Sequence, residues 1–264
     1  GLPGVQSELA AAVAATGTPT VVVVVSGRVH PLEDEAAAAD ALLWAILPGE
    51  EGGRAIADVL TGAVDPAGRL PVTIPRHVGQ VPIHHDMRRR GDKSEFYGDY
   101  VDRPAAPRFV FGHGRSYTTF EYGEPTVTGG STTAPTTITV EVTNVGERDG
   151  DEVVQLYATD DVASLARPIR ELIGFRRLPI PAGTSRTVTF TVDPSRLAFH
   201  GPDHRLVTEP GRFTFRIGGS SAESDLHPVE VTLGGPVAEY ERRSIVATTS
   251  TVLTDRLTSD HEVS

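Results

Sequence analysis

Apolar residues near the start of the chain recur at helical spacing or gather in short continuous runs. Val5, Leu9 and Val13 lie four residues apart in an alanine-rich stretch, which predicts an amphipathic helix. The β-branched run at residues 20–25 has no polar alternation. It therefore predicts a strand that is covered on both faces, as in a parallel sheet.

The alternation of helix-like and strand-like stretches continues along the first 124 residues. A short helix is predicted over residues 33–39, a second apolar run follows at residues 41–47, and residues 52–60 again show helical periodicity. This order predicts an open, mainly parallel α/β sheet in residues 1–124. Because only two strands are clear where such a sheet needs several, we expect this α/β sandwich domain to be partial and truncated at its N-terminus.

In the second half of the chain the apolar period changes to two. Ile138, Val140 and Val142 alternate with polar residues. Similar runs follow at residues 153–157, 171–178, 186–192, 213–217 and 229–233. Short strands separated by turn clusters predict an all-β sandwich over residues 125–235. Residues 236–264 are rich in Ser and Thr without a sustained period, so we expect a disordered tail.

Charge and composition exclude several classes of partner. The net charge of -11 is spread evenly, with 11 basic and 16 acidic residues in 1–124 and 13 and 19 in 125–264. Nucleic acids and anionic membranes need clustered Lys and Arg, so neither is expected as a partner. The chain has no cysteine, which excludes disulfides and thiolate metal sites. Its apolar runs are far too short to span a bilayer, and its compartment stays unknown.

Three motifs rich in Gly and Pro stand in a fixed order: Pro48-Gly-Glu-Glu-Gly-Gly53, Asp65-Pro-Ala-Gly-Arg-Leu-Pro-Val-Thr-Ile-Pro75 and Phe111-Gly-His-Gly-Arg-Ser-Tyr-Thr-Thr-Phe120. Each alone would mark only a turn. Together they resemble the C-terminal half of glycoside hydrolase family 3, the β-glucosidase and β-xylosidase family. The later stretches Glu141-Val-Thr-Asn-Val-Gly146 and Gly150-Asp-Glu-Val-Val-Gln-Leu-Tyr157 resemble the fibronectin type III-like module that ends many of its members.

The resemblance implies the C-terminal portion of a retaining, exo-acting β-glycosidase, with β-glucosidase as the first choice. The substrate would be a β-glucoside or an oligosaccharide, and no cofactor or metal would be needed. Both catalytic carboxylates of the family would lie upstream of Gly1, the nucleophile in an N-terminal barrel domain of the same polypeptide. We therefore expect no catalytic residue in this chain and no activity from it alone. The alternatives are a stand-alone carbohydrate-binding or adhesion module, a degenerate fragment, and a β-xylosidase.

Local side chains offer little chemistry of their own. A retaining glycosidase needs two carboxyl groups about 5 Å apart, whereas the adjacent Glu50 and Glu51 would point in different directions. Next to two glycines they suit the start of a helix, where they cap amides and favour its dipole. His84-His85-Asp86 would diverge on an extended loop, which disfavours a metal site. His113, between two glycines, is predicted to be structural.

The polar and aromatic segment 81–102 is the candidate for sugar recognition. It resembles the family's corresponding stretch at Lys93-Ser94 and Gly98-Asp-Tyr-Val-Asp102, and departs from it at residues 84–87. Sugar hydroxyls need directed donors and acceptors, while the C–H face of the ring stacks on aromatic side chains. The predicted substrate-binding residues are Lys93, Phe96, Asp86 and His85. The alternative is a surface loop that Phe96 and Tyr100 pin to the sheet.

Overall fold

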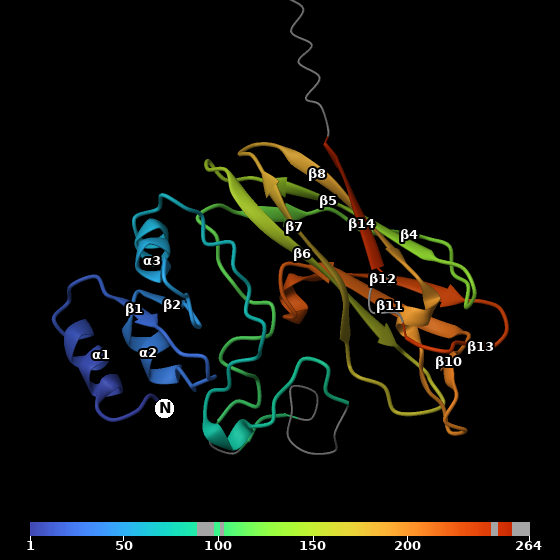
Figure 1. The fold of residues 1–264 in the computed structure, drawn as a ribbon, viewed down its shortest axis with the longest axis horizontal. Coiled ribbons are helices and arrows are strands. Elements are labelled where there is room, and N and C mark those ends of the chain that lie inside the picture. Colours follow the sequence, from blue (N-terminus) through green and yellow to red (C-terminus); the bar gives the residue numbers. More distant parts are fainter. Residues whose placement is uncertain (89–97, 101–102, 244–247, 255–264) are drawn as a thin grey trace, which may run out of the picture. The chain divides into compact units, whose positions relative to one another are not determined.

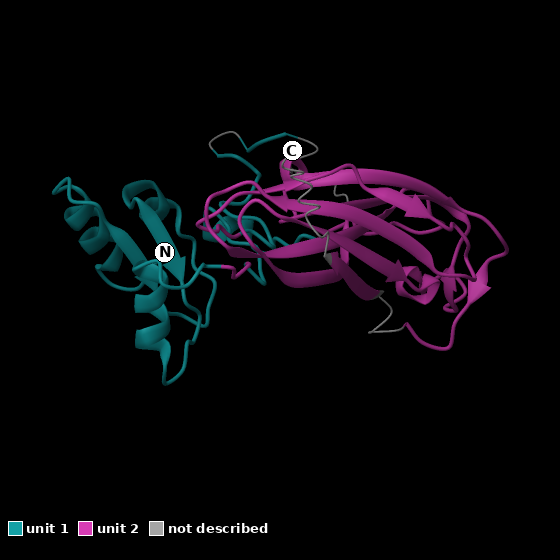
Figure 2. Cartoon of the chain, turned by 90° about the horizontal axis from the view of Figure 1, so that it is seen from above, with its two compact units in different colours: residues 1–66, 70–85, 90–113 teal, residues 67–69, 86–89, 114–264 magenta. Residues whose placement is uncertain are grey.

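The computed structural model of the protein describes residues 1–88, 98–100, 103–243 and 248–254. The chain forms two compact units, which Figure 2 shows in different colours. The first contains residues 1–66, 70–85 and 90–113. The second contains residues 67–69, 86–89 and 114–264. The chain therefore passes from one unit to the other several times.

The first unit is built on two parallel strands and three helices (Figure 1). Its elements are α1 (Gln6–Ala14), β1 (Val21–Val24), α2 (Glu33–Ala38), β2 (Ala41–Trp44), α3 (Gly52–Leu60) and the 3-10 turn η1 (Val78–Gln80). β1 and β2 pair in parallel, from Val21 opposite Ala41 to Val24 opposite Trp44. The predicted α/β class and the positions of its helices and strands are confirmed.

The burial predicted for this unit is wrong at α1 and β1. Val5, Leu9 and Val13 are 67%, 64% and 44% exposed, and only Val24 of β1 is buried. α1 contacts α2 with a polar position instead, because the Ser7 hydroxyl donates to the buried Glu35 carboxylate at 2.5 Å. The apolar stripe of the helix is therefore present and faces away from its neighbours in the described chain.

The second unit is a sandwich of two antiparallel sheets. One has the strand order β12-β11-β6-β7, and the other has the order β14-β8-β5-β3, with β4 also paired to β5. A third, small sheet joins β13, β10 and β9. The strands are β3 (Phe120–Tyr122), β4 (Thr126–Thr128), β5 (Thr136–Asn144), β6 (Gly150–Asp160), β7 (Glu171–Ile180), β8 (Ser185–Val192), β9 (Phe199–His200), β10 (Leu206–Thr208), β11 (Gly211–Gly218), β12 (Leu226–Leu233), β13 (Ala238–Glu239) and β14 (Thr248–Thr254). The 3-10 turns are η2 (Pro194–Leu197) and η3 (Glu223–Asp225).

The core of the sandwich lies between its two main sheets. Apolar side chains at alternate positions of β5, β6, β8 and β11 fill it, and the largest include Phe190, Phe215 and Ile138. The period of two predicted this, because successive side chains of a strand point to opposite faces. No helix among the described residues has the length and apolar character needed to cross a membrane.

The sandwich extends past both boundaries expected from the sequence. β3 lies before residue 125 and pairs with β5, so that Tyr122 stands opposite Val142. β13 and β14 lie in the expected tail, and β14 forms an edge strand on β8. β14 reads Thr-Thr-Ser-Thr-Val-Leu-Thr, whose β-branched residues suit a strand although few are apolar. The expectation of disorder from residue 236 onward is therefore wrong for these two strands.

We predict that Val252→Asp destabilises the chain and Leu253→Asp does not. Val252 packs against the sandwich core, whereas its neighbour Leu253 is exposed. A charge forced against an apolar core costs about 1–3 kcal/mol or more in the free energy of unfolding. Urea unfolding of the two variants measures this difference. Equal effects would mean that β14 does not cover the core in solution.

Candidate functional site

Two of the motifs rich in Gly and Pro pair with each other in the first unit. Residues 70–74 run antiparallel to residues 109–113. Their backbone hydrogen bonds include Leu70 N–H to His113 O at 2.8 Å, Gly112 N–H to Leu70 O at 2.8 Å and Ile74 N–H to Phe109 O at 2.9 Å. Because the two stretches are paired, the chain between them leaves and returns at one place. We call the paired residues 70–74 and 109–113, with Arg76 and Arg108 next to them, the base. The polar segment 81–102 lies in the chain between the two sides of this base.

The second of these stretches ends in a tight turn that needs its glycines. The His113 amide donates to the Val110 carbonyl at 3.2 Å, and Gly112 has a φ of 77°, which favours glycine. In the second unit, a Cβ atom at Gly114 would lie 2.2 Å from the carbonyl oxygen of Gly68. The His113 ring stacks on Phe109 with 5.2 Å between ring centroids, which agrees with the structural role predicted for it.

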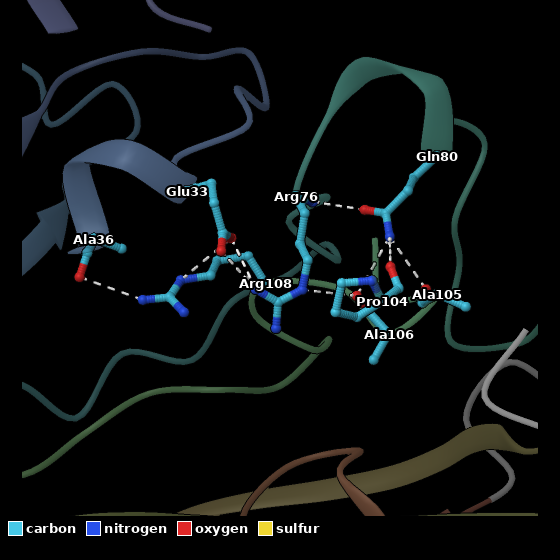
Figure 3. A network of polar contacts seen from close by, with 8 residues as sticks. All are labelled: Glu33, Ala36, Arg76, Gln80, Pro104, Ala105, Ala106 and Arg108. Carbon is cyan, nitrogen blue, oxygen red and sulfur yellow. Dashed lines mark hydrogen bonds and ion pairs between the residues drawn. The ribbon is translucent and has the colours of Figure 1, made fainter. Parts of the chain in front are cut away.

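The buried side chain of Gln80 joins residue 76 to residues 104–106, on either side of the polar segment (Figure 3). Gln80 is 8% exposed, and its Oε1 accepts a hydrogen bond from the Arg76 amide at 2.6 Å. Its Nε2 faces three consecutive carbonyl oxygens, those of Pro104 at 3.1 Å, Ala105 at 3.2 Å and Ala106 at 3.3 Å. A buried amide so fully used fixes the chain on both sides of the polar segment.

An ion-pair network ties the same base to α2 (Figure 3). Both carboxylate oxygens of Glu33 accept from Arg76 Nη1, at 2.7 and 2.9 Å, and Arg108 Nε lies 3.7 Å from the same carboxylate. Arg108 also donates to the Ala36 carbonyl, and Arg76 donates to the Ala106 carbonyl. Glu33, the first residue of α2, thus binds one arginine from each side of the base.

The four predicted sugar-binding residues have different outcomes. His85 is half-buried and its ring stacks on Phe111, with 4.0 Å between centroids and 17° between planes. Asp86 is exposed, and it belongs to the second unit. Lys93 and Phe96 lie outside the described residues. The structure thus fixes one aromatic platform and one exposed carboxylate of the predicted set.

The other acidic and metal candidates remain minor. Glu50 and Glu51 are both exposed before α3, and the side chain of Glu51 at the N-cap accepts no cap hydrogen bond, so the capping predicted for it is wrong. In the described part of the chain, no group of three His, Cys, Asp or Glu residues could hold a metal ion.

Sequence reasoning missed a buried ionic cluster in the second unit. Glu152 is 3% exposed, accepts from Arg69 Nη2 at 2.7 Å and accepts from the Tyr122 hydroxyl at 3.0 Å. Burial raises the pKa of Glu152 against the opposing charge of Arg69. Burial, followed by the charge of Glu152, holds the pKa of Tyr122 well above its ordinary value. The available signal was Arg69 itself, a charged residue inside the motif 65–75.

A second charged pair lies at the end of β6. Arg167 Nε lies 3.8 Å from Asp160 Oδ2, and its guanidinium stands over the Phe199 ring at 4.5 Å from the centroid. Burial raises the pKa of Asp160 to about 6. Arg167 opposes the rise, and the charges of Glu209 and Asp161 add to it. Arg167 directly precedes Pro168 and Ile169, which contact Arg88 and Met87 within the second unit.

Both parts of the chain match known domain families. Residues 1–117 match the family model of the glycosyl hydrolase family 3 C-terminal domain. Residues 152–221 match that of the fibronectin type III-like domain. These matches agree with the α/β unit and the β-sandwich described above.

Individual relatives cover most of this chain. It is 40% identical to a beta-xylosidase of Formosa agariphila over 88% of its length, and 38% identical to a periplasmic beta-glucosidase of Salmonella typhimurium over 84%. The crystal structure of a beta-glucosidase from Listeria innocua in complex with glucose aligns with a TM-score of 0.84, at 33% identity, over 90% of this chain. The aligned regions make up 32%, 30% and 34% of these three proteins, so the chain spans about a third of their length.

We predict that Gln80→Met destabilises the first unit while Val78→Ala leaves it unchanged. Methionine has a similar length, but it leaves the Arg76 amide and the buried Ala105 carbonyl without the partner that Gln80 provides, whereas the Ala106 carbonyl keeps Arg76. Each unsatisfied buried polar group costs about 1–3 kcal/mol. Val78 is exposed in the same turn and serves as the matched control. Chemical denaturation with a probe in the first unit, such as Trp44 fluorescence, measures the difference; equal midpoints would contradict it.

A pH dependence follows from the raised pKa of Asp160. Between its ordinary value of 3.8 and about 6, the folded chain holds the proton more tightly than the unfolded chain. The contribution of this group to the free energy of unfolding is therefore present below pH 3.8 and is lost as the pH rises through about 6. We expect Asp160→Asn to gain stability relative to the wild type over that range. Urea unfolding at several pH values measures this, with the exposed Glu147→Gln as control; a constant difference would contradict it.

Proposed function

Because the chain contains the C-terminal domain of glycosyl hydrolase family 3 and a fibronectin type III-like domain, we propose that it is the C-terminal portion of a retaining, exo-acting β-glucosidase. The observation that carries the proposal is the match of both domains, in order, to proteins named as β-glycosidases over 84–88% of the chain. The proposed substrates are β-glucosides or oligosaccharides with a terminal β-glucosyl residue.

In this proposal both catalytic carboxylates lie upstream in the same polypeptide, the nucleophile in a barrel domain and the acid/base in a loop shortly before residue 2. Support comes from the lengths of the relatives, because the region aligned with this chain makes up only about a third of each. Support also comes from the apolar stripe of α1, where Val5, Leu9 and Val13 lie four residues apart and are exposed in the described chain. Contiguous exposed apolar surface marks an interaction site. Upstream polypeptide is the proposed cover.

The proposed sugar-binding residues are His85, Asp86, Lys93 and Phe96. For His85 the support is its half-exposed ring, which Phe111 holds in a fixed orientation. For Asp86 it is an exposed carboxylate, an acceptor suited to sugar hydroxyls. Lys93 and Phe96 rest on sequence alone. Gln80 and Glu33 hold the described chain on either side of this segment, at residue 76 and at residues 104–108.

β-Xylosidase activity is the second candidate. A specific observation favours it, since the relative of 40% identity is named a beta-xylosidase. The two sugars differ by the hydroxymethyl group on C5 of glucose. A pocket that leaves room for this group accepts both, and one that fills the room rejects glucose.

The decisive test compares this chain with the polypeptide extended by its upstream coding region. We expect the extended protein to release nitrophenol from nitrophenyl β-glucoside and this chain to release none, because catalysis by such a carboxylate pair supplies about 8 kcal/mol or more of barrier lowering. Nitrophenyl β-xyloside is assayed in parallel. Activity that copurifies with this chain would contradict the proposal, and preference for the xyloside would select the second candidate.

We further predict that His85→Ala and Asp86→Ala reduce kcat/KM of the extended protein, whereas His84→Ala does not. Losing a stacked ring or a carboxylate that bonds a hydroxyl corresponds to about 1–3 kcal/mol in transition-state terms. His84 is an exposed neighbour of the same type and is the matched control. Melting temperatures are measured alongside. Lower melting temperatures with unchanged kcat/KM would assign these residues to structure alone.

A further inference from the structure

A short piece of the candidate sugar-binding segment is built into the sandwich. Residues 86–88 belong to the second unit. The Ile169 amide donates to the Met87 carbonyl at 2.9 Å, and Arg88 forms an antiparallel bridge with Pro168. Met87 and Arg88 are thus held beside Pro168 and Ile169 by one backbone hydrogen bond and one isolated bridge.

The pairing lies directly after a turn at residues 85–86. Met87 is half-buried, while Asp86 and Arg88 on either side of it are exposed. The hydrogen bond at Met87 therefore holds the backbone directly after the exposed Asp86.

The pairing residue is itself fastened to two core strands. The Ile169 carbonyl accepts from the Thr159 hydroxyl of β6 at 2.7 Å. The oxygen of the same hydroxyl accepts from Arg216 Nη1 of β11 at 2.8 Å. Arg216 Nε lies 3.3 Å from Glu223, which also pairs with Arg170 at 3.0 Å. The residue after Ile169 is thus tied to the same network.

The hydrogen bonds from Thr159 to Ile169 and from Ile169 to Met87 restrict the position of the Met87 backbone. Ile169 uses its amide on Met87 and its carbonyl on Thr159, so a shift of either partner moves the other. Hydrogen bonds that follow one another in a partly buried place strengthen each other. The sandwich, whose core is closed on its own, is the rigid body from which this chain of bonds starts.

We propose that the fibronectin type III-like unit positions Asp86 for substrate through Thr159 and Ile169. The inference rests on the proposed function, in which the Asp86 carboxylate accepts hydrogen bonds from sugar hydroxyls. Such bonds require donor and acceptor within about 2.5–3.0 Å, so a carboxylate that drifts by 1 Å loses them. Thr159 and Ile169 are positioning residues that touch no substrate, and the sandwich takes part in sugar selectivity.

The test uses Thr159→Val, which keeps the shape and removes the hydroxyl, and Thr159→Ser, which keeps the hydroxyl. In the extended protein we expect Thr159→Val to raise KM for nitrophenyl β-glucoside about fivefold with kcat within twofold. Thr159→Ser should stay within twofold of the wild type in both. Hydrogen exchange of the Ile169 amide, measured in this 264-residue chain, should be slow in the wild type and in Thr159→Ser and faster in Thr159→Val.

A double-mutant cycle separates positioning from general loosening. In an Asp86→Ala background, Thr159→Val should no longer raise KM, because the group that it positions has gone. An equal rise in both backgrounds would overturn the inference, as would fast exchange of the Ile169 amide in the wild type. If Asp86→Ala changes KM and Thr159→Val does not, positioning fails while the sugar contact stands. If Asp86→Ala changes nothing, the sugar contact fails and the inference falls with it.

Discussion

The buried carboxylate of Glu152 requires a cationic partner. This requirement explains why residues 67–69, which form no helix or strand, belong to the second unit. Glu152 lies on β6 among the strands of the sandwich, and its cationic partner is Arg69, 83 residues away in the sequence. Removing one partner of a buried ion pair costs about 3–5 kcal/mol, because a charge is left without compensation. Residues 67–69 therefore belong to the sandwich although the residues on either side of them belong to the other unit.

The same requirement governs the long connections without regular structure. Such a stretch lacks the regular backbone hydrogen bonds of a helix or a sheet. Its buried amides and carbonyls therefore need partners from other parts of the chain. In the first unit Gln80 supplies them for three carbonyl groups, and Glu33 holds the arginines beside it. In the second unit the Ile169 amide supplies one for Met87. Each partner comes from a place that the local sequence does not indicate.

This difference explains how far the sequence could predict the structure. Periodicity gave the strands of the sandwich, such as the alternating Ile138, Val140 and Val142, and it gave α3 to the residue. It could not show that the stripe of α1 stays exposed, since burial depends on what packs against a helix. β14 was not predicted, because most of its residues are Thr and it therefore shows no alternation of apolar and polar positions. The hydrogen bonds of Gln80 with Ala106, of Arg69 with Glu152 and of Thr159 with Ile169 join residues 26, 83 and 10 positions apart, and no local pattern encodes them.

The way in which the segment 86–88 is held also bears on its sequence. It is fastened through the carbonyl oxygen of Met87, and the aromatic and acidic side chains beside it take no part in that bond. Every amino acid has this carbonyl, so position 87 can change its side chain and keep the attachment. Residues 84–87 are where this chain departs from the family sequence that it resembles. A change of side chain at position 87 therefore leaves the bond from the Ile169 amide available.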